Sequence, residues 1–307
     1  MTRDEFLARL AGLRQARVGQ VSVPHKPLLL LWLFGQFAAT GSSEASYQQV
    51  EEPVSQPIND FGPPVASAAA ARQRAAMPFV HLERELWDLQ DATGKEIAPD
   101  APERRAWLLD RGAVGRLRAP VERLLADPAT LGAAARLLLD LHFTPVLAKL
   151  ICASVDLDVP ALDLAGSERV SSTVQLRPRR RGFAEEVLRA YAYQCAMCGF
   201  DGALGHYPVA IEAAHVRWHS QQGPDEMANA LALCALHHAL FDLGVLGITE
   251  DRRIRVSSLF VARNEAGQAV DALPGKSLLI PRPRQPTVDV VYISWHHRQV
   301  FKGPLRI

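Results

Sequence analysis

The amino-acid sequence predicts an α+β protein of two domains: an α-rich N-terminal domain with a small sheet, and a C-terminal domain organised around a group of cysteines. Three observations support this prediction. Apolar residues recur at helical spacing through much of residues 1–155, and the polar stretch 156–176 has the composition of a linker. Three of the four cysteines of the 307-residue chain lie within residues 177–307. A chain of this length can bury cores that are stable without disulfides.

The first segments of the N-terminal domain are predicted to be helical. Residues 5–17 carry apolar side chains at helical spacing. Residues 28–34 would be apolar on nearly every side of a helix, so we expect this helix to form the core of the domain. It follows Pro27, a residue that suits the first helical turn. Residues 41–47 have the composition of a loop. Residues 51–61 predict a further short helix, although two internal prolines argue against it.

A small sheet and further helices are predicted for the rest of this domain. Residues 78–82 and 85–89 are short segments rich in apolar and aromatic side chains, and we expect two strands around a turn. Three later segments are rich in Ala, Leu or both and predict helices at residues 121–125, 131–141 and 145–152.

The charges are distributed unevenly along the chain. In total, 34 Lys and Arg against 33 Asp and Glu leave a formal charge of +1, which indicates no partner. Up to residue 165, however, 17 basic residues accompany 20 acidic ones, a net −3, and after it 17 accompany 13, a net +4. The linker runs into a basic cluster that contains Arg179, Arg180 and Arg181. Beside a nucleic-acid site such a cluster contacts the phosphate backbone, and elsewhere it is a solvated linker.

Neither a membrane segment nor an export signal is predicted. The longest apolar runs, such as residues 28–34, have seven residues, and spanning a bilayer takes about 18. The N-terminus carries acidic residues where a signal peptide would be basic and then apolar. We therefore expect a cytoplasmic protein, in which clustered cysteines are metal ligands rather than disulfides.

Two pairs of residues have the spacing of a metal site. Cys195 and Cys198 form a C-x2-C pair, and Cys234 and His237 form a C-x2-H pair, with 35 residues between the two pairs. Three thiolates and one imidazole make a common tetrahedral set for structural zinc, and iron is the competing soft-ligand metal. The alternative is that the cysteines are small buried residues, which is the simplest interpretation of the remaining one, Cys152.

The residues around these pairs form a nuclease pattern. Residues 209–216 predict a strand that ends near His215, Asn229 opens a second apolar segment, and His238 directly follows the second metal pair. Over about residues 183–244 this pattern resembles the HNH (ββα-metal) endonucleases. The resemblance implies that His215 is the general base for phosphodiester hydrolysis and that His238 binds a catalytic Mg²⁺ or Mn²⁺ ion. Asn229 would either ligate the same ion or fix the loop that orients His215.

One position departs from the HNH pattern. Many HNH enzymes have a carboxylate directly before the first histidine as a further metal ligand, and this chain has Ala214 there. The ion is then held either by His238 with Asn229 or with the help of Glu212, and both arrangements stay open.

The N-terminal domain carries the motifs of a second family. Residues 24–34, 78–87, 112–117 and 142–145 resemble the sulfur-binding domain of phosphorothioated-DNA-dependent restriction endonucleases, which join that domain to a C-terminal HNH module. The physical requirement is a shallow apolar cup beside cations, because sulfur in place of a phosphate oxygen is larger and less well hydrated. The residues expected at this cup are His25, Lys26, Met77, Pro78 and His81.

Within the expected cup, Lys26 would contact the phosphate and the Pro78 ring would form an apolar wall without an N–H group. The family tends to have an aromatic residue before this proline, and the chain has Met77 there, whose thioether suits contact with sulfur. The alternative is that His25 and Lys26 merely lead a core helix and that Pro78 starts a strand.

The two resemblances imply a restriction endonuclease that recognises phosphorothioate-modified double-stranded DNA and cleaves it with Mg²⁺ or Mn²⁺, supported by one structural zinc ion. Two alternatives are an HNH restriction enzyme that reads methylated or unmodified DNA, and a catalytically silent zinc-stabilised DNA-binding protein. One active site per chain suggests a homodimer for cutting both strands, and sequential nicking is equally allowed.

Overall fold

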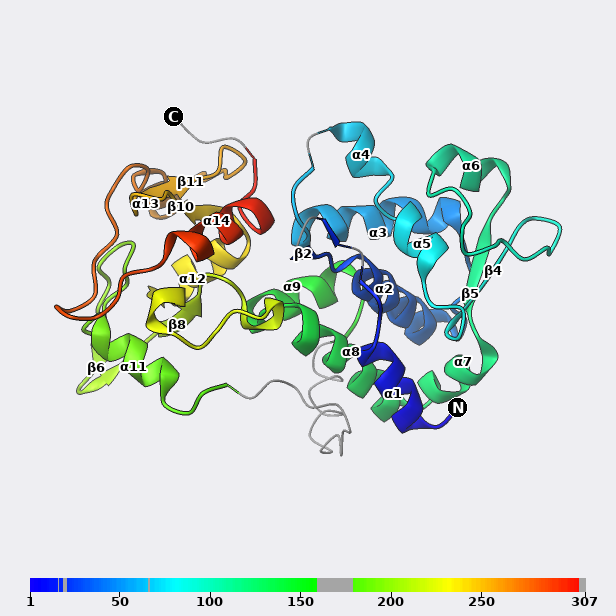
Figure 1. The fold of residues 1–307 in the computed structure, drawn as a ribbon, viewed down its shortest axis with the longest axis horizontal. Helices are drawn as coiled ribbons and strands as arrows, with labels where there is room; N and C mark the ends of the chain where they lie inside the picture. The colour runs from blue at the N-terminus through cyan, green and yellow to red at the C-terminus, as the bar shows by residue number, and fades with distance from the viewer. Residues whose placement is uncertain (16, 19–20, 66, 159–178, 304–307) are drawn as a thin grey trace. The chain divides into compact units, whose positions relative to one another are not determined.

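The computed structural model describes residues 1–15, 17–18, 21–65, 67–158 and 179–303. The chain divides into two compact units, unit 1 (Met1–Leu176) and unit 2 (Arg177–Ile307). In Figure 1 the colours of unit 1 run from blue to green and those of unit 2 from light green to red. Within the described ranges, no helix combines the length and the apolarity that crossing a membrane requires.

Unit 1 consists of short helices and a small sheet (Figure 1). Its helices are α1 (Arg3–Ala11), α2 (His25–Thr40), α3 (Tyr47–Phe61), α4 (Ala68–Arg72), α5 (Ala76–His81), α6 (Arg105–Asp110), α7 (Ala119–Leu125), α8 (Pro128–His142) and α9 (Pro145–Ser154). An antiparallel sheet has the strand order β3 (Ala45–Ser46), β5 (Val114–Leu117), β4 (Trp87–Gln90). A separate antiparallel pair is formed by β1 (Arg17–Val18) and β2 (Val21–Ser22).

The predicted core helix is confirmed as α2. Residues 28–31, Leu33 and Phe34 have no exposed surface, and α2 packs on α3, α5 and α8. Full burial of one such apolar side chain stabilises the fold by about 2 kcal/mol. The helix stops at Gly41, whose φ of 74° is left-handed and whose N–H donates to the Phe37 carbonyl. This helix therefore organises the core of unit 1.

The predicted helix at residues 51–61 is confirmed as part of α3, which begins at Tyr47. It begins earlier because Ser46 and Gln49 form a capping box in which each side chain accepts the other residue's backbone N–H. Both predicted helix breakers, Pro53 and Pro57, lie inside α3. One side of the helix is buried at a spacing of four residues, through Val50, Val54 and Ile58. This packing offsets the backbone hydrogen bonds that the prolines remove.

The predicted strand at residues 78–82 is wrong, because this segment belongs to helix α5. Phe79 and Val80 are consecutive and both fully buried, whereas a strand turns consecutive side chains to opposite faces. The Phe79 ring lies 5.4 Å from the rings of both Tyr47 and Trp87, edge to face in each case. Enclosure on several sides thus favours the helix over the strand. The second predicted strand is confirmed as β4.

The helix predicted at residues 5–17 is too long, since α1 ends at Ala11 and is capped by Gly12. The expected loop at residues 41–47 contains the two-residue strand β3. The three later helix predictions are confirmed as α7, α8 and α9.

Unit 2 contains short helices and two-stranded antiparallel sheets, so the predicted α+β class is confirmed. Its elements are α11 (Phe183–Ala190), β6 (Ala203–Leu204), β7 (Tyr207–Pro208), β8 (Ile211–His215), η1 (His219–Gln221), η2 (Met227–Asn229), β9 (Ala230–Cys234), α12 (Ala235–Asp242), β10 (Leu246–Ile248), β11 (Ile254–Val256), α13 (Glu265–Asp271) and α14 (Val290–Gln299).

The strands β8 and β9 form an antiparallel hairpin that leads directly into α12. Its register pairs His215 with Ala230 and Ile211 with Cys234. Every residue of β9 is buried, and α11 and α12 both pack on the hairpin. His215 therefore lies at one end of the hairpin, on the partly buried strand β8, and Cys234 lies at the other end, on the buried strand β9.

Candidate functional site

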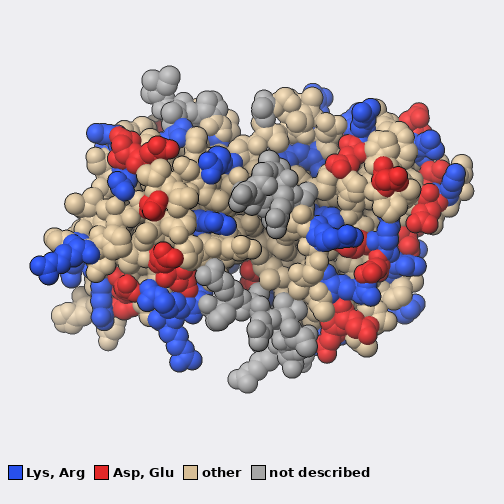
Figure 2. Space-filling view, viewed as in Figure 1, with Lys and Arg blue, Asp and Glu red and all other residues tan. Residues whose placement is uncertain are grey.

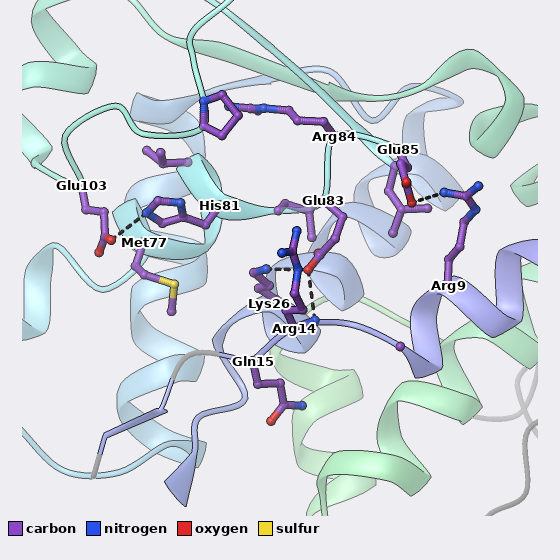
Figure 3. A pocket seen from close by; sticks show the side chains of 15 residues that line it. Arg9, Arg14, Gln15, Lys26, Met77, His81, Glu83, Arg84, Glu85 and Glu103 are labelled. Atoms are coloured by element: carbon purple, nitrogen blue, oxygen red, sulfur yellow. Dashed lines mark hydrogen bonds and ion pairs between the residues drawn. The ribbon is translucent and has the colours of Figure 1, made fainter. Parts of the chain in front are cut away.

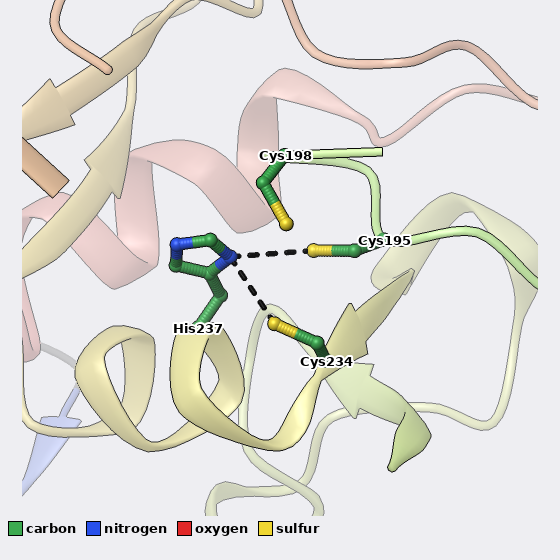
Figure 4. Close-up of side chains that lie close together, drawn as sticks. All are labelled: Cys195, Cys198, Cys234 and His237. Carbon is green, nitrogen blue, oxygen red and sulfur yellow. Dashed lines mark hydrogen bonds between the residues drawn. The ribbon is translucent and has the colours of Figure 1, made fainter. Parts of the chain in front are cut away.

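The four predicted zinc ligands lie together in unit 2 (Figure 4). Their potential ligand atoms are all within 4.8 Å of one another. His237 Nδ1 is 3.4 Å from Cys195 Sγ and 3.3 Å from Cys234 Sγ. Two ligands of a tetrahedral zinc ion, at about 2.3 Å for sulfur and about 2.0 Å for nitrogen, lie about 3.5 Å apart. The donor set and its spacing therefore fit one metal ion.

The protonation of the thiols also favours a cation between them. Burial raises the pKa of the Cys195 thiol, but hydrogen bonds led by that from His237 outweigh burial and bring this pKa to about 6. Burial raises the pKa of the Cys198 thiol to about 12, and the neighbouring Cys195 charge adds to the rise. Three thiolates can share this space only when a cation offsets their repulsion.

His215 is held by a carboxylate that lies ten residues further along the chain. Its Nε2 is 2.8 Å from Asp225 Oδ1, and the two side chains are 9% and 8% exposed. Because an ionised carboxylate only accepts hydrogen bonds, Nε2 carries the proton and Nδ1 of the neutral ring keeps a free lone pair. The ring also lies 5.0 Å from the Phe183 ring and 5.7 Å from that of His219.

The protonation of this pair suits proton transfer. Burial lowers the pKa of His215, and this effect outweighs the hydrogen bond and the charge of Asp225, which raise it. Burial opposes ionisation of Asp225, but hydrogen bonds from the Arg180 backbone N–H and from His215 outweigh burial, so the Asp225 pKa is lowered. At neutral pH the pair is thus a neutral imidazole beside a carboxylate.

Asn229 is completely buried, and among the described residues its side chain forms hydrogen bonds with the loop that follows β8. Its Oδ1 accepts the Arg217 N–H at 2.7 Å, and its Nδ2 donates to the carbonyls of Arg217 and Pro224, each at 3.0 Å. These bonds clamp the loop that carries His219 and leads to Asp225. Of the two roles left open by the sequence, the burial and the bonds favour fixing the loop over ligating an ion.

His238 lies on α12 between two carboxylates. Its Nδ1 is 2.6 Å from Glu212 Oε2, and its Nε2 is 3.5 Å from Asp242 Oδ2. Burial lowers the pKa of His238, but the hydrogen bond to Glu212 and the charge of Asp242 outweigh burial and raise it. The hydrogen bond with His238 lowers the pKa of Glu212, whose side chain is 49% exposed. Glu212 thus presents an ionised carboxylate to solvent beside His238.

The predicted basic cluster lies next to these groups. The charge of Arg179 lowers the pKa of both His215 and His238, so a single exposed guanidinium acts on both histidines. Arg180 is engaged within unit 2, since it forms an ion pair with Glu186 at 2.6 Å and its guanidinium lies 5.4 Å from the Phe183 ring centroid. Arg181 is exposed. The positive charge of Arg179 therefore lies close enough to His215 and His238 to affect both.

Unit 1 contains a cavity of about 810 Å³ (Figure 3). Three of the five residues expected at a sulfur cup line it, namely Lys26, Met77 and His81. The other two, His25 and Pro78, are not among its lining residues. Burial, together with the charge of Arg74, lowers the pKa of His25 to about 3, and His25 Nε2 lies 2.9 Å from Arg74 Nη2. His25 is therefore a neutral, partly buried residue in hydrogen-bond contact with Arg74.

The cavity also contains charged residues that were not predicted from the sequence. Lys26 Nζ is 2.7 Å from Glu83 Oε1, and His81 Nε2 is 2.6 Å from Glu103 Oε1. Arg9 pairs with Glu85, and further lining residues include Arg14, Arg84 and Pro99. The local signal was the charged run Glu83-Arg84-Glu85 just after α5. Figure 2 shows Lys and Arg beside Asp and Glu on the visible face of each unit, so local pairing matters more than total charge.

Two family models match the chain. Residues 3–159 match the ScoMcrA-like DNA sulfur-binding domain, and residues 195–249 match an HNH endonuclease. A comparison with curated proteins gave no match. The two predicted resemblances are therefore confirmed at the level of the domains.

Solved structures with some likeness to the chain have low similarity scores. A sulfur-binding domain of SprMcrA complexed with phosphorothioated DNA is 23% identical, with a TM-score of 0.38, over 54% of this chain and 94% of that one. A modification-dependent TagI restriction endonuclease is 24% identical, with a TM-score of 0.29, over 44% and 41%. The sulfur-binding and SRA domains of ScoMcrA complexed with phosphorothioated DNA are 19% identical, with a TM-score of 0.44, over 68% of each chain.

Proposed function

Because the chain belongs to the ScoMcrA-like DNA sulfur-binding domain family and also carries an HNH endonuclease domain, we propose that it is a restriction endonuclease specific for phosphorothioate-modified double-stranded DNA. Unit 1 binds the modified backbone and unit 2 hydrolyses phosphodiester bonds. The observation that carries the proposal is the pairing of His215 with Asp225 beside the Glu212–His238 pair, within the segment that matches the nuclease family.

His215 is the general base of this reaction. Its Nδ1 lone pair takes a proton from water, the oxygen of that water attacks phosphorus, and the bond to the 3′ oxygen breaks. Asp225 is a positioning residue: it fixes the tautomer through Nε2 and stabilises the imidazolium that forms when the proton arrives. Asn229 keeps the loop in place so that Asp225 reaches His215. Arg179 attracts the phosphate to the two histidines.

Glu212 and His238 are the proposed ligands of a catalytic Mg²⁺ or Mn²⁺ ion. Their 2.6 Å separation is near the distance of about 3 Å between two ligands that meet an ion at about 2.1 Å and at right angles. Asp242 faces the other ring nitrogen of His238 and orients the ring. Glu212 thus takes the place of the carboxylate missing at Ala214. When bound, the ion would neutralise charge that builds up on the phosphoryl oxygens.

Zinc is the proposed occupant of the Cys195, Cys198, Cys234 and His237 cluster, because tetrahedral sites rich in thiolate select it. The cluster joins the turn after α11 to the end of β9 and the start of α12. A zinc ion there would fix the hairpin that carries His215 relative to the helix that carries His238.

The cavity of unit 1 is the proposed sulfur-binding site. Met77 supplies an apolar side chain, and Lys26 supplies the cation that accompanies a phosphate. A phosphorothioate sulfur loses little hydration in such a setting, whereas a phosphate oxygen loses much more. Pro99 lines the cavity, and we assign it the apolar role expected for Pro78. His25 does not line the cavity and forms a hydrogen bond with Arg74 instead.

A cleavage assay on DNA that carries phosphorothioate linkages tests the function. Wild type is expected to cut in the presence of Mg²⁺ or Mn²⁺ and to stop when a chelator is added. His215→Ala is expected to lose about 10²- to 10⁴-fold in rate, because it removes the base, while its thermal unfolding stays close to wild type. Equal cutting by His215→Ala and wild type would contradict the catalytic assignment.

Sedimentation of the protein with DNA distinguishes a dimer from sequential nicking by one chain.

A further inference from the structure

A carboxylate lies inside the cavity that we propose for the modified phosphate. The Glu83 side chain is 15% exposed, and its Oε1 accepts from Lys26 Nζ at 2.7 Å and from the Arg14 backbone N–H at 3.1 Å. Its second oxygen, Oε2, is buried and has no hydrogen-bond partner among the residues that the structure describes. Figure 3 shows Glu83 pointing at Lys26 in the middle of the lining residues.

This arrangement is unfavourable for a protein that needs only a cation for phosphate. Leaving one carboxylate oxygen buried without such a partner is unfavourable, and the negative charge opposes entry of any anion. The ion pair also engages the Lys26 ammonium, whose side chain is only 7% exposed. Lys26 therefore has its charge offset before DNA arrives.

Offsetting the charge of Lys26 affects the binding of a phosphate oxygen and the binding of a phosphorothioate sulfur differently. A phosphate oxygen is small and strongly hydrated, so it enters the cavity only if a cation replaces the water that it loses. The sulfur of a phosphorothioate is larger and less well hydrated, and contact with the Met77 thioether and the Pro99 ring replaces much of what it loses. A cavity with an engaged lysine thus penalises the unmodified backbone more than the modified one.

We propose that Glu83 is a specificity-determining residue that withholds the Lys26 ammonium from ordinary phosphates and so enforces selection for sulfur. The proposal rests on the proposed function of the cavity. It predicts that removing the Glu83 charge strengthens binding of unmodified DNA and reduces discrimination, rather than weakening binding of all DNA.

The test is filter binding of the full-length protein to two pools of short duplexes. One pool carries a single central phosphorothioate linkage flanked by random bases, and the other is identical but unmodified. The discrimination ratio is the apparent affinity for the first pool divided by that for the second. Glu83→Gln is nearly isosteric, and its amide oxygen can still accept the Arg14 N–H. Glu52→Gln removes the same charge from an exposed position that does not line the cavity and is the matched control.

We expect the discrimination ratio of Glu83→Gln to fall about tenfold or more, through tighter binding of the unmodified pool, with Glu52→Gln within about twofold of wild type. Adding Lys26→Met to Glu83→Gln should reverse the gain for unmodified DNA, which checks the mechanism independently of folding. An unchanged ratio in a folded Glu83→Gln, with wild type discriminating, would overturn this proposal and leave the proposed function intact. Wild type without discrimination would overturn both.

Discussion

At the scale of single residues, the contact between His215 and Asp225 determines the protonation state in which the site works. The His215 pKa is lowered because burial outweighs the carboxylate beside it. The neutral form is the one that accepts a proton from water, and a lowered pKa keeps this form present at a lower pH than an ordinary histidine, whose pKa is about 6.5. If His215 is the base, we expect activity to persist through neutral pH and to be lost on the acid side.

The pH profile of cleavage is expected to show this. At saturating Mg²⁺, the acid limb of kcat/KM for wild type should lie below pH 6.5. Asp225→Asn removes the charge that raises the His215 pKa, so its acid limb should move to still lower pH. Its maximal rate should fall about tenfold or more, because the imidazolium loses its partner.

The control for this profile is Asp201→Asn, which neutralises an exposed carboxylate elsewhere in unit 2. It should leave both the limb and the maximum unchanged. An acid limb that moves to higher pH in Asp225→Asn would show that Asp225 does not act on His215.

Residue spacing was sufficient to predict the cysteine–histidine cluster, because its two pairs carry their geometry in the sequence. It was insufficient for Asn229 and Glu212, whose roles depend on which loop or helix each side chain faces. The cup was predicted with five residues, of which the cavity contains Lys26 but not its neighbour His25. Consecutive helical residues point about 100° apart, and the sequence does not tell which of the two faces the cavity.

At the scale of elements, the metal cluster joins the β8–β9 hairpin to α12 and to the turn after α11. We expect about one zinc per chain. Cys195→Ser should lose the metal and greatly destabilise unit 2, because the binding of structural zinc contributes directly to folding. Cys152→Ala is the control variant, since this cysteine lies in α9 of unit 1, and it should retain the metal. Metal analysis and thermal unfolding of both variants check this. A folded Cys195→Ser with its full metal content would refute the ligand assignment.

In the sheet of unit 1, the Trp87 ring packs directly against the backbone of Gly115, and this contact predicts how a substitution there affects stability. An added Cβ at Gly115 on β5 would lie 1.9 Å from Trp87 Cζ2 on β4, and the Trp87 ring is fully buried. Gly115→Ala should therefore lower the free energy of unfolding by about 1–3 kcal/mol. Gly12→Ala, where the nearest atom would be 3.4 Å away, should change it much less. Equal effects in denaturant unfolding would contradict the packing.

Helices with a continuous apolar side, such as α2 and α8, could be predicted from the sequence because the periodicity is local. α5 could not, because Phe79 packs against Trp87 on β4 and against Tyr47 on α3, and the contact with Tyr47 joins residues 32 positions apart in the chain. Packing with distant elements overrides short-range preference in a segment of six residues.

At the scale of the whole molecule, the match to a DNA sulfur-binding domain and the match to an HNH endonuclease fall in separate units of one chain. The near-zero total charge conceals a net −3 up to residue 165 and a net +4 after it. Two of the four Lys and Arg residues that line the cavity, Arg9 and Lys26, form ion pairs with carboxylates. General attraction to DNA does not distinguish a modified from an unmodified backbone, so we expect the local chemistry of the cavity to do so.

The most direct test of this account is digestion of one plasmid, prepared with and without phosphorothioate linkages, by wild-type protein at saturating Mg²⁺. If unit 1 directs the nuclease to phosphorothioate linkages, the modified plasmid is cut and the unmodified plasmid stays intact under the same conditions. Equal cutting of the two plasmids would contradict the central claim that unit 1 directs the nuclease to sulfur.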